Sequence, residues 1–579
     1  MRRLAAALLL VSACDDPART LVPMDAAPRD ASDASLDAAV DAGPSGVGLG
    51  CSDERDLTEV SRGCRGGQLC FTSAHGYPGG YCTQDCTRTP CPGDAFCIDD
   101  NSEHYCLQRC TDDAQCRTAE GYICEHPAPL LPRACIPDPA PLGTGPGGRA
   151  CFDPADGGVS GLPARTFRSG FASVSHDRAD SDSEAQPSIA VSPRTGAVVV
   201  AYDARTARQE LFVGVSHVTP PGAWSRDGSI VDRNYVESND PQLAYAPDGT
   251  LFATYLASTP ERPQPAMQFL RSADDGATWS APVDIVPDGY CAGGCDPPWL
   301  ALGPAPAGSS TPRIHVAYIT RSTRRDAWVT VQRSDDGGAT WTPPVHLAAV
   351  LALTSQIALE PAYPTIAAAP DGKVWVAWAM VSRANARAVL GDVHNRVQVA
   401  FSGDGGAHFG DPATVSSSDV AVVSQPPQLA VARGVAHVVY VTGAADARWN
   451  VVLGAEVRTA TDARWVSTVV NDDPVACATH GYTAVAGDDA RGLVHVLWED
   501  DRFGGGEVAY TGCVAGSPQR CAPNEVLSDA HFDLSTTADV TRWAGTHNAL
   551  AVGPDGALWA AWSDTRTGGP AVYVARGTP

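Results

Sequence analysis

Five arginine residues recur at one kind of position in the long C-terminal part of the chain, each shortly after an apolar run. These residues are Arg205, Arg321, Arg383, Arg502 and Arg566. Several of them stand in Asp-x-Arg triplets, such as Asp203-Ala204-Arg205 and Asp564-Thr565-Arg566. A guanidinium group offers paired donors to a carboxylate, so several arginines gathered at one site would clamp a carboxylate ligand. The alternative, which the sequence leaves open, is that each arginine pairs with its neighbouring aspartate and stiffens its own loop.

A second set of polar and aromatic residues lies in the loops expected just before apolar strands. The candidates for ligand binding in this set are Asp240, Asp296, Trp299 and His547. Weaker candidates for catalysis are two pairs, Tyr363 with Glu360 and Tyr482 with His480. A neighbouring acid or base can activate a tyrosine hydroxyl, but nearness on one loop is weak evidence for such a role.

The sequence predicts no organic cofactor. No phosphate-binding loop, dinucleotide fingerprint or His-Glu-x-x-His motif occurs in a suitable context. A structural Ca²⁺ bound by carboxylates such as Asp240 and Asp296 is a further hypothesis, because calcium is coordinated by oxygen ligands.

The elements that must position these residues repeat along the chain. Seven segments share an apolar strand, a turn that often reads Pro-Asp-Gly, and a second strand rich in Val, Ala and aromatic residues. They are residues 186–202, 241–255, 298–318, 364–378, 427–440, 483–498 and 548–562. Their starts lie about 60 residues apart, a period typical of a β-propeller, whose blades bury their faces only against each other. We therefore expect an all-β chain with a seven-bladed propeller, with six blades as the alternative.

The last repeat ends after its third strand, at residues 571–575. Its blade needs a fourth strand, and residues 166–175 lie just before the first repeat, where they can supply it. Such a closure would remove the exposed sheet edge of the last blade.

A sharper motif follows the third strand of several repeats. It reads Ser272-x-Asp274-x-Gly276-x-Thr278-Trp279 and Ser334-x-Asp336-x-Gly338-x-Thr340-Trp341, with a near match in Ser402-x-Asp404-x-Gly406-x-His408-Phe409. We interpret it as a structural turn: the Asp accepts backbone N–H bonds, the Gly takes a positive φ, and the ring packs under the hairpin. The sixth repeat has Cys513-x7-Cys521 at this place, which predicts a disulfide clamp instead.

With these motifs, residues 165–579 resemble the sialidase-like (BNR/Asp-box) propeller superfamily. The resemblance implies an exo-α-sialidase, with an Arg triad on the sugar carboxylate, a Tyr–Glu nucleophile and an Asp acid/base, as one candidate activity. The chain departs from that pattern, because it lacks an Arg-Ile-Pro near the first repeat and has seven repeats where sialidases have six blades. Propellers of this kind also include binding proteins and other glycosidases, so the fold alone predicts no reaction.

Strand order predicts where the candidate residues meet. The first strand of each blade is innermost, so the loops before first strands and after second strands share one face. The Asp-boxes then lie on the other face. Both sets of candidate residues are therefore expected at one mouth of the propeller.

The cysteines define a separate module. The chain has 19 Cys, which is typical of an exported protein, and 13 of them fall in residues 51–151. Two units in this module repeat with an offset of 24 residues, Cys82 to Cys97 and Cys106 to Cys124. We expect disulfides rather than zinc, since no Cys-x2-Cys knuckle occurs. The odd count favours a bridge to the propeller, for which Cys151 with Cys477 is a hypothesis, or a free thiol. Cys291-x3-Cys295 predicts a small disulfide-closed loop.

The N-terminus predicts export and anchoring. Arg2 and Arg3 precede a short apolar run, as in a signal peptide over residues 1–13, and Val11-Ser12-Ala13-Cys14 resembles a bacterial lipobox with lipidation at Cys14. Residues 14–50 are rich in Asp, Ala and Pro, which predicts a disordered tether. The module over 51–151 and the propeller over 152–579 follow.

Together these features predict a lipid-anchored protein of the bacterial cell envelope that binds an extracellular glycan or protein. Hydrolysis of an anionic sugar is the alternative. The formal charge of −25 disfavours nucleic acid as a partner, and the membrane is expected to be contacted through the lipid anchor alone.

Overall fold

A computed structural model describes the residues on which the following account depends. They are residues 47, 49, 64, 68–71, 81–86, 89–100, 103–117, 122–125, 133–137, 167–173, 181–206, 211–220, 222–230, 237–258, 266–287, 290–322, 326–352, 358–382, 395–417, 422–423, 425–444, 448–458, 463–473, 480–502, 506–532, 547–566 and 570–578. The predictions for Cys14, Arg383, Cys151 and Cys477 lie outside these residues. Among the described residues, no helix is long and apolar enough to span a bilayer.

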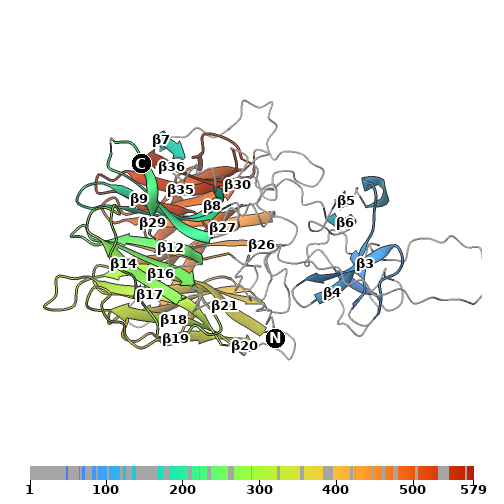
Figure 1. The fold of residues 1–579 in the computed structure, drawn as a ribbon, viewed down its shortest axis with the longest axis horizontal. Coiled ribbons are helices and arrows are strands. Elements are labelled where there is room, and N and C mark those ends of the chain that lie inside the picture. Colours follow the sequence, from blue (N-terminus) through green and yellow to red (C-terminus); the bar gives the residue numbers. More distant parts are fainter. Residues whose placement is uncertain are drawn as a thin grey trace, which may run out of the picture.

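Seven antiparallel sheets, the blades, make up most of the described chain (Figure 1). Blade 1 contains β8 (Ser181–Val191), β9 (Val198–Thr206), β10 (Leu211–Val218) and β11 (Ser225–Ser229). Blade 2 contains β12 (Glu237–Tyr245), β13 (Leu251–Ser258), β14 (Ala266–Ser272) and β15 (Val283–Asp284). Blade 3 contains β16 (Cys295–Gly303), β17 (Arg313–Arg321), β18 (Ala327–Ser334) and β19 (Val345–Ala349).

The remaining blades follow in chain order. Blade 4 contains β20 (Leu351–Ala352), β21 (Ala358–Ala368), β22 (Val374–Ser382), β23 (Arg396–Ser402) and β24 (Ala413–Thr414). Blade 5 contains β25 (Gln428–Ala432), β26 (Val435–Ala444), β27 (Arg448–Arg458) and β28 (Ala463–Val469). Blade 6 contains β29 (His480–Asp488), β30 (Leu493–Asp500), β31 (Glu507–Val514), β32 (Ser517–Cys521) and β33 (Glu525–Val526). Blade 7 contains β34 (Ala549–Val552), β35 (Leu558–Asp564), β36 (Ala571–Gly577) and β7 (Phe167–Ser173).

The blades form a closed ring. Each innermost strand contacts the innermost strand of the next blade, and β34 of blade 7 contacts β8 of blade 1. Apolar clusters of buried side chains fill the contacts between successive blades, including the one where blade 7 meets blade 1. The seven-bladed propeller is therefore confirmed, and the six-bladed alternative is excluded.

The ring closes as the sequence predicted. β7 comes from before the first blade and pairs with β36, with Ala172 opposite Val574 and Ser173 opposite Tyr573. The outer edge of β36 is thereby covered by a strand from the other end of the propeller sequence, which accounts for the missing fourth strand of the last repeat.

The Asp-boxes have the predicted turn geometry. In blade 2, Asp274 Oδ1 accepts the N–H of Thr278 at 2.8 Å, Ser272 Oγ accepts the N–H of Gly276 at 2.9 Å, and Gly276 has φ 87°. The boxes at Asp336 and Asp404 repeat these bonds. Burial would raise the pKa of Asp274, but bonds from Thr278 and Ser272 outweigh it and lower that pKa.

The rings of the Asp-boxes do more than the sequence predicted. Trp279, Trp341 and Phe409 each pack into the apolar cluster between their own blade and the preceding blade. Trp341, for example, meets Phe269 edge-on at 5.4 Å between ring centroids. An Asp-box therefore also joins two blades.

Both predicted disulfides of the propeller are present. Cys513 and Cys521 are cross-strand partners in β31 and β32 and are bonded, so this pair clamps the hairpin that an Asp-box closes in other blades. Cys291 and Cys295 close a small loop directly before Asp296.

The Cys-rich module is a separate body of paired strands: β1 (Leu69–Phe71), β2 (Tyr81–Thr83), β3 (Ala95–Asp100), β4 (Glu103–Gln108), β5 (Tyr122–Glu125) and β6 (Ala134–Pro137), with a short 3₁₀ helix, η2 (Asp113–Gln115) (Figure 1). Its described disulfides are Cys64–Cys82, Cys86–Cys97, Cys91–Cys106, Cys110–Cys124 and Cys116–Cys135.

The last four of these bonds form two interlaced pairs, which matches the predicted tandem repeat. The sulfur atoms of Cys86, Cys91 and Cys97 lie within 4.8 Å of one another, but all three are in disulfides and offer no thiolate to a metal. The buried side chain of Val47 belongs to the core of this module, so the module extends N-terminally beyond the boundary expected at residue 51.

Candidate functional site

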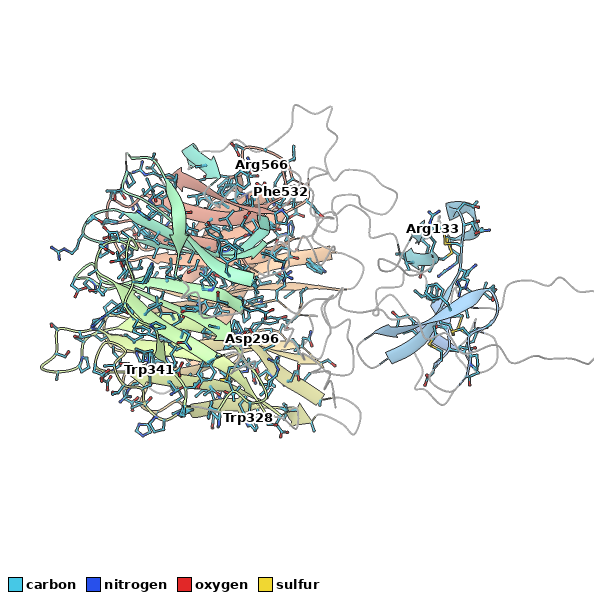
Figure 2. The ribbon with its side chains drawn as sticks, in the orientation of Figure 1. Arg133, Asp296, Trp328, Trp341, Phe532 and Arg566 are labelled. Atoms are coloured by element: carbon cyan, nitrogen blue, oxygen red, sulfur yellow. A yellow bond between two sulfur atoms is a disulfide. The ribbon has the colours of Figure 1, made fainter. Side chains whose placement is uncertain are left out.

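The mouth is defined here as the end of the ring where the first strands begin and the second strands end. Figure 2 shows Trp341 of an Asp-box toward the left of the propeller and Asp296, Phe532 and Arg566 toward the right. Strand order places Asp240, Trp299, Tyr363, His480 and His547 at the same end as Asp296. The predicted candidates among the described residues thus share the mouth.

One expectation about these residues is wrong in detail. Seven candidates were expected in loops before the first strands but belong to those strands: Asp240, Asp296, Trp299, Glu360, Tyr363, His480 and Tyr482. The first strands continue across a β-bulge, seen as a register shift in blades 1, 2, 3, 4 and 6. A bulge interrupts the alternation of side chains between the two faces of a strand, but the strand continues. The sequence at a bulge therefore resembles that of a loop.

A left-handed residue occupies the bulge in four blades. These residues are Gln186 (φ 51°), Asp240 (φ 55°), Tyr363 (φ 52°) and Tyr482 (φ 50°). The first three precede Pro187, Pro241 and Pro364, and a following proline disfavours the right-handed helical region. A non-glycine residue with positive φ is strained, and such strain is often found at functional sites. The recurrent X-Pro dipeptide is the sequence signal that could have located the bulges.

Side chains from distant blades meet across the propeller axis. The rings of Trp299 in blade 3 and His547 beside blade 7 lie 5.3 Å apart. Gln428 of blade 5 donates through Nε2 to the carbonyl of Thr483 in blade 6, at 2.6 Å, and to that of Asn548 beside blade 7, at 3.2 Å. At this level the central channel is crossed by the protein's own side chains, and Trp299 remains partly exposed.

Three buried carboxyl groups from successive blades meet at the mouth. Asp203 Oδ1, at the end of the second strand of blade 1, accepts the N–H of Asp240 in blade 2 at 2.8 Å. The charge of Asp296 in blade 3 acts on both Asp203 and Asp240. Burial raises the pKa of Asp203 to about 8, and burial together with the charges of Asp203 and Asp296 raises the pKa of Asp240 well above its usual value.

This arrangement bears on the calcium hypothesis. Calcium is coordinated by oxygen ligands, and Asp240 and Asp296 are buried carboxyl groups at one place in the ring. The calcium hypothesis stays a prediction.

Arg502 is buried and held by Asp500 of its own blade and by Asp472 of the segment after β28. Its guanidinium binds Asp500 in a forked manner, with Nε 2.9 Å and Nη2 2.7 Å from Oδ2, and Nη1 is 2.9 Å from Asp472 Oδ1. Asp500 also accepts the indole N–H of Trp498 at 2.9 Å. The Asp500 carboxylate thus connects Trp498 with Arg502 at the end of β30.

Arg566 repeats this arrangement in blade 7. Its Nε lies 2.7 Å from Asp564 Oδ2, its Nη1 lies 2.5 Å from Asp529 Oδ1, and Trp562 donates to Asp564 at 3.0 Å. The shared pattern is Trp-x-Asp-x-Arg. Trp378 of blade 4 has Met380 at the place of the aspartate, and its buried indole N–H lacks a hydrogen-bond partner among the described residues.

The other two described arginines also lie near carboxyl groups. Arg321 Nη1 is 3.9 Å from Asp296 Oδ2, and the charge of Arg205 acts on Asp203. These contacts, and those of Arg502 and Arg566, are the ones expected if each arginine is paired within its own part of the ring.

His480 and the two tyrosines have structural surroundings of their own. His480 is fully buried between Asp473, 3.0 Å from Nε2, and Asp500, 3.3 Å from Nδ1. Burial would lower the pKa of His480, but the two carboxylates outweigh it and raise that pKa to about 9. The N–H of Tyr482 donates to Gln425 Oε1 at 2.9 Å. Tyr363 is buried beside Ala379 and Val381, and Glu360 is partly exposed.

Glu499 is a mouth residue that the sequence analysis missed. It is buried between blades 6 and 7, and its Oε1 accepts a bond from Asn548 Nδ2 at 3.3 Å. Burial raises the pKa of Glu499 well above its usual value. The sequence signal for Glu499 was an acidic residue directly after a tryptophan in a strand, as in Trp498-Glu499. This pattern is also typical of an ordinary strand end, so it did not single out Glu499.

Comparison with known proteins agrees with the fold. Residues 196–438 match the model of the BNR repeat-like domain. The predicted resemblance to the sialidase-like Asp-box propellers is therefore confirmed. No curated protein matches the chain in sequence.

Several solved structures are similar to this chain at low identity. An α-L-arabinanase of Penicillium chrysogenum, complexed with arabinobiose, is 18% identical with a TM-score of 0.37, over 58% of this chain and 92% of that chain. A Hadza microbial sialidase is 15% identical with a TM-score of 0.38, over 65% of this chain and 73% of that chain. A polysaccharide lyase described as an ulvan lyase is 11% identical with a TM-score of 0.42, over 68% of this chain and 94% of that chain. At these identities and TM-scores, the similarities assign no activity to this chain.

Proposed function

We propose that this chain is a cell-envelope lipoprotein whose propeller binds an extracellular glycan or protein at the mouth. The observation that carries the proposal is the forked pairing of Arg502 with Asp500 and of Arg566 with Asp564. A guanidinium held in this way has few donors left for the carboxylate of an anionic sugar. The mouth thus lacks two of the cations that a sialidase-like clamp would use.

The chemistry of the mouth favours a neutral ligand over an anionic one. Asp203, Asp240, Asp296 and Glu499 are buried there; in the protonated form they offer no cation to an anion, and in the ionised form they repel it. Neutral sugars instead pair hydroxyl groups with carboxyl groups and stack on aromatic rings. The partly exposed Trp299 at the centre of the mouth is suited to such stacking.

The location is part of the proposal and depends on the sequence. Lipidation at Cys14, after a short apolar run, would attach the chain to a membrane of the cell envelope. The Asp- and Ala-rich segment after Cys14 would then hold the propeller away from the lipid surface. Labelling of the cells with a radioactive fatty acid tests this step, and it should label the wild type but not Cys14→Ser.

Binding is tested with the full secreted chain carrying Cys14→Ser. We expect hits on a glycan array among neutral glycans, loss of these hits in Trp299→Ala, and no turnover of a fluorogenic sialoside. Trp328→Ala is the matched control, because Trp328 lies in the same blade but packs on His346 of an outer strand, at 5.4 Å between ring centroids. It should bind like the wild type.

The same assay can overturn the proposal. Hydrolysis of the sialoside that is lost in Tyr363→Phe or Tyr482→Phe would instead support a glycoside hydrolase acting on an anionic sugar. Array hits that Trp299→Ala leaves unchanged would place the binding surface away from the mouth.

A further inference from the structure

A short segment between blades 6 and 7, residues 527–532, is held in place at the mouth. Gly506 and Phe532 exchange two backbone hydrogen bonds, at 2.7 Å and 2.9 Å, directly before β31. Leu527 and Phe532 are buried in the apolar cluster between the two blades. Because β31 begins where β30 ends, the segment lies at the mouth, and Figure 2 shows Phe532 at the same end as Asp296.

His531 is the residue of this segment that faces a buried carboxyl group. Its Nδ1 lies 2.7 Å from Oε1 of Glu507, the first residue of β31. The side chain of Glu507 is 2% exposed and that of His531 is 32% exposed. Nδ1 is itself buried against Glu507, so Nε2 is the ring nitrogen that is left toward the outside of the mouth.

The surroundings of Glu507 differ from those of a carboxylate that faces a histidine for structural reasons. Asp404 lies 2.7 Å from Nδ1 of the exposed His408, and it also accepts bonds from the N–H of His408 at 2.9 Å and from Ser402 Oγ at 2.8 Å. Neither oxygen of Glu507 accepts a hydrogen bond from another group in the part of the chain that the structure describes. A buried carboxyl group so poorly supplied with donors lowers stability, which favours a role in holding His531 over a role in folding.

The state of the pair also bears on what it can bind. Burial, with the charges of Asp500 and Asp501, raises the pKa of Glu507 to about 9, so the pair keeps a proton at neutral pH. A hydroxyl group both donates and accepts hydrogen bonds, so it can pair with Nε2 whichever atom of the pair holds that proton.

We propose that His531 is a second ligand contact of the mouth, at which Nε2 pairs with a hydroxyl group of a neutral oligosaccharide, and that Glu507 is a positioning residue for its imidazole. This inference rests on the proposed function. In a blade, the third strand lies roughly 10 Å from the first, because neighbouring strands are about 4.8 Å apart. A ligand that contacts Trp299 on a first strand and His531 beside a third strand therefore extends beyond one sugar ring.

The test uses the full secreted chain with Cys14→Ser and, as the probe, the neutral oligosaccharide with the strongest array signal, titrated by calorimetry. His531→Ala and Glu507→Leu should each weaken binding about fivefold, the loss expected for one hydrogen bond. Glu507→Gln should bind like the parent chain, because an amide can pair with Nδ1 as the carboxyl group does. His408→Ala is the matched control and should not change binding, because His408 faces Asp404 in the same way but lies in an Asp-box at the other end of the ring.

The outcomes separate this contact from the proposed function. If the parent chain binds no neutral glycan, both are overturned. Binding that is lost in Trp299→Ala but unchanged in His531→Ala would overturn the second contact alone. Equal losses in Glu507→Gln and Glu507→Leu would overturn the positioning role of Glu507. If Glu507→Leu does not fold, Glu507→Gln decides, and a loss of affinity in it overturns that role.

Discussion

Asp500 shows what a single buried carboxylate does in this propeller. It binds Arg502 in a forked manner, accepts the indole N–H of Trp498 and faces His480 at 3.3 Å. The pKa of Asp500 is lowered: burial would raise it, but His480 and Arg502 outweigh that effect. One anion thus compensates two buried cations. Its removal would take away a negative charge that both Arg502 and His480 contact.

We expect Asp500→Ala to lower the free energy of unfolding by about 3–5 kcal/mol, the usual cost of breaking a buried ion pair from one side. Urea unfolding, followed by tryptophan fluorescence, measures this change. Asp335→Ala should cost less than about 1 kcal/mol, because the side chain of Asp335 is 42% exposed where it pairs with Arg313. Similar costs for the two variants would show that the buried network is not important for stability.

At the scale of single residues, the sequence predicted the contacts that form between residues close together in the chain. The Asp-box bonds lie within a few residues of each other, and Cys513 and Cys521 face each other across one hairpin. The meeting of Asp203, Asp240 and Asp296 depends on three blades and on a bulge with left-handed φ. Spacing along the chain does not show which residues of different blades meet. The sequence therefore singled out Asp240 and Asp296 but not the groups around them.

Among the elements, the turn of the Asp-box depends on its glycine for two reasons. Gly338 has φ 88°, and a Cβ there would lie 1.9 Å from Cε1 of Phe269 in the preceding blade. The turn can therefore approach the neighbouring blade only because this residue has no side chain. Gly308, at φ 83°, has no atom within 4 Å of such a Cβ.

These two glycines separate backbone strain from the contact between blades. Gly308→Ala should cost about 1–2 kcal/mol from the left-handed backbone alone. Gly338→Ala should cost a further 1–3 kcal/mol, roughly the penalty for overpacking a filled core. Urea unfolding measures both, and an equal cost would mean that the Asp-box does not join the blades.

The whole molecule depends on a closure that the sequence also predicted. Counting repeats and strands showed that the last blade lacked one strand and that residues 166–175 could supply it, and the structure has β7 there. The global fold could be predicted because each blade repeats the same pattern. The bulges could not, because they break the alternation by which a strand is recognised in sequence.

Deleting residues 167–173 from the full chain should leave β36 as an exposed edge. We expect a lower midpoint of thermal unfolding and concentration-dependent association, since an unpaired strand is a template for other chains. Light scattering after size-exclusion chromatography and thermal scans measure the two effects. Removing seven residues from the Asp- and Ala-rich segment, 30–36, is the control of equal length and should change neither.

The same closure sets an order of events during synthesis. The residues of β7 leave the ribosome well before those of β36. Until β36 has been synthesised, the nascent chain holds a strand whose partner has not yet been made, and the ring stays open. A ribosome that stalls between these two strands would release a product with an unmatched strand before its first blade and no closed ring.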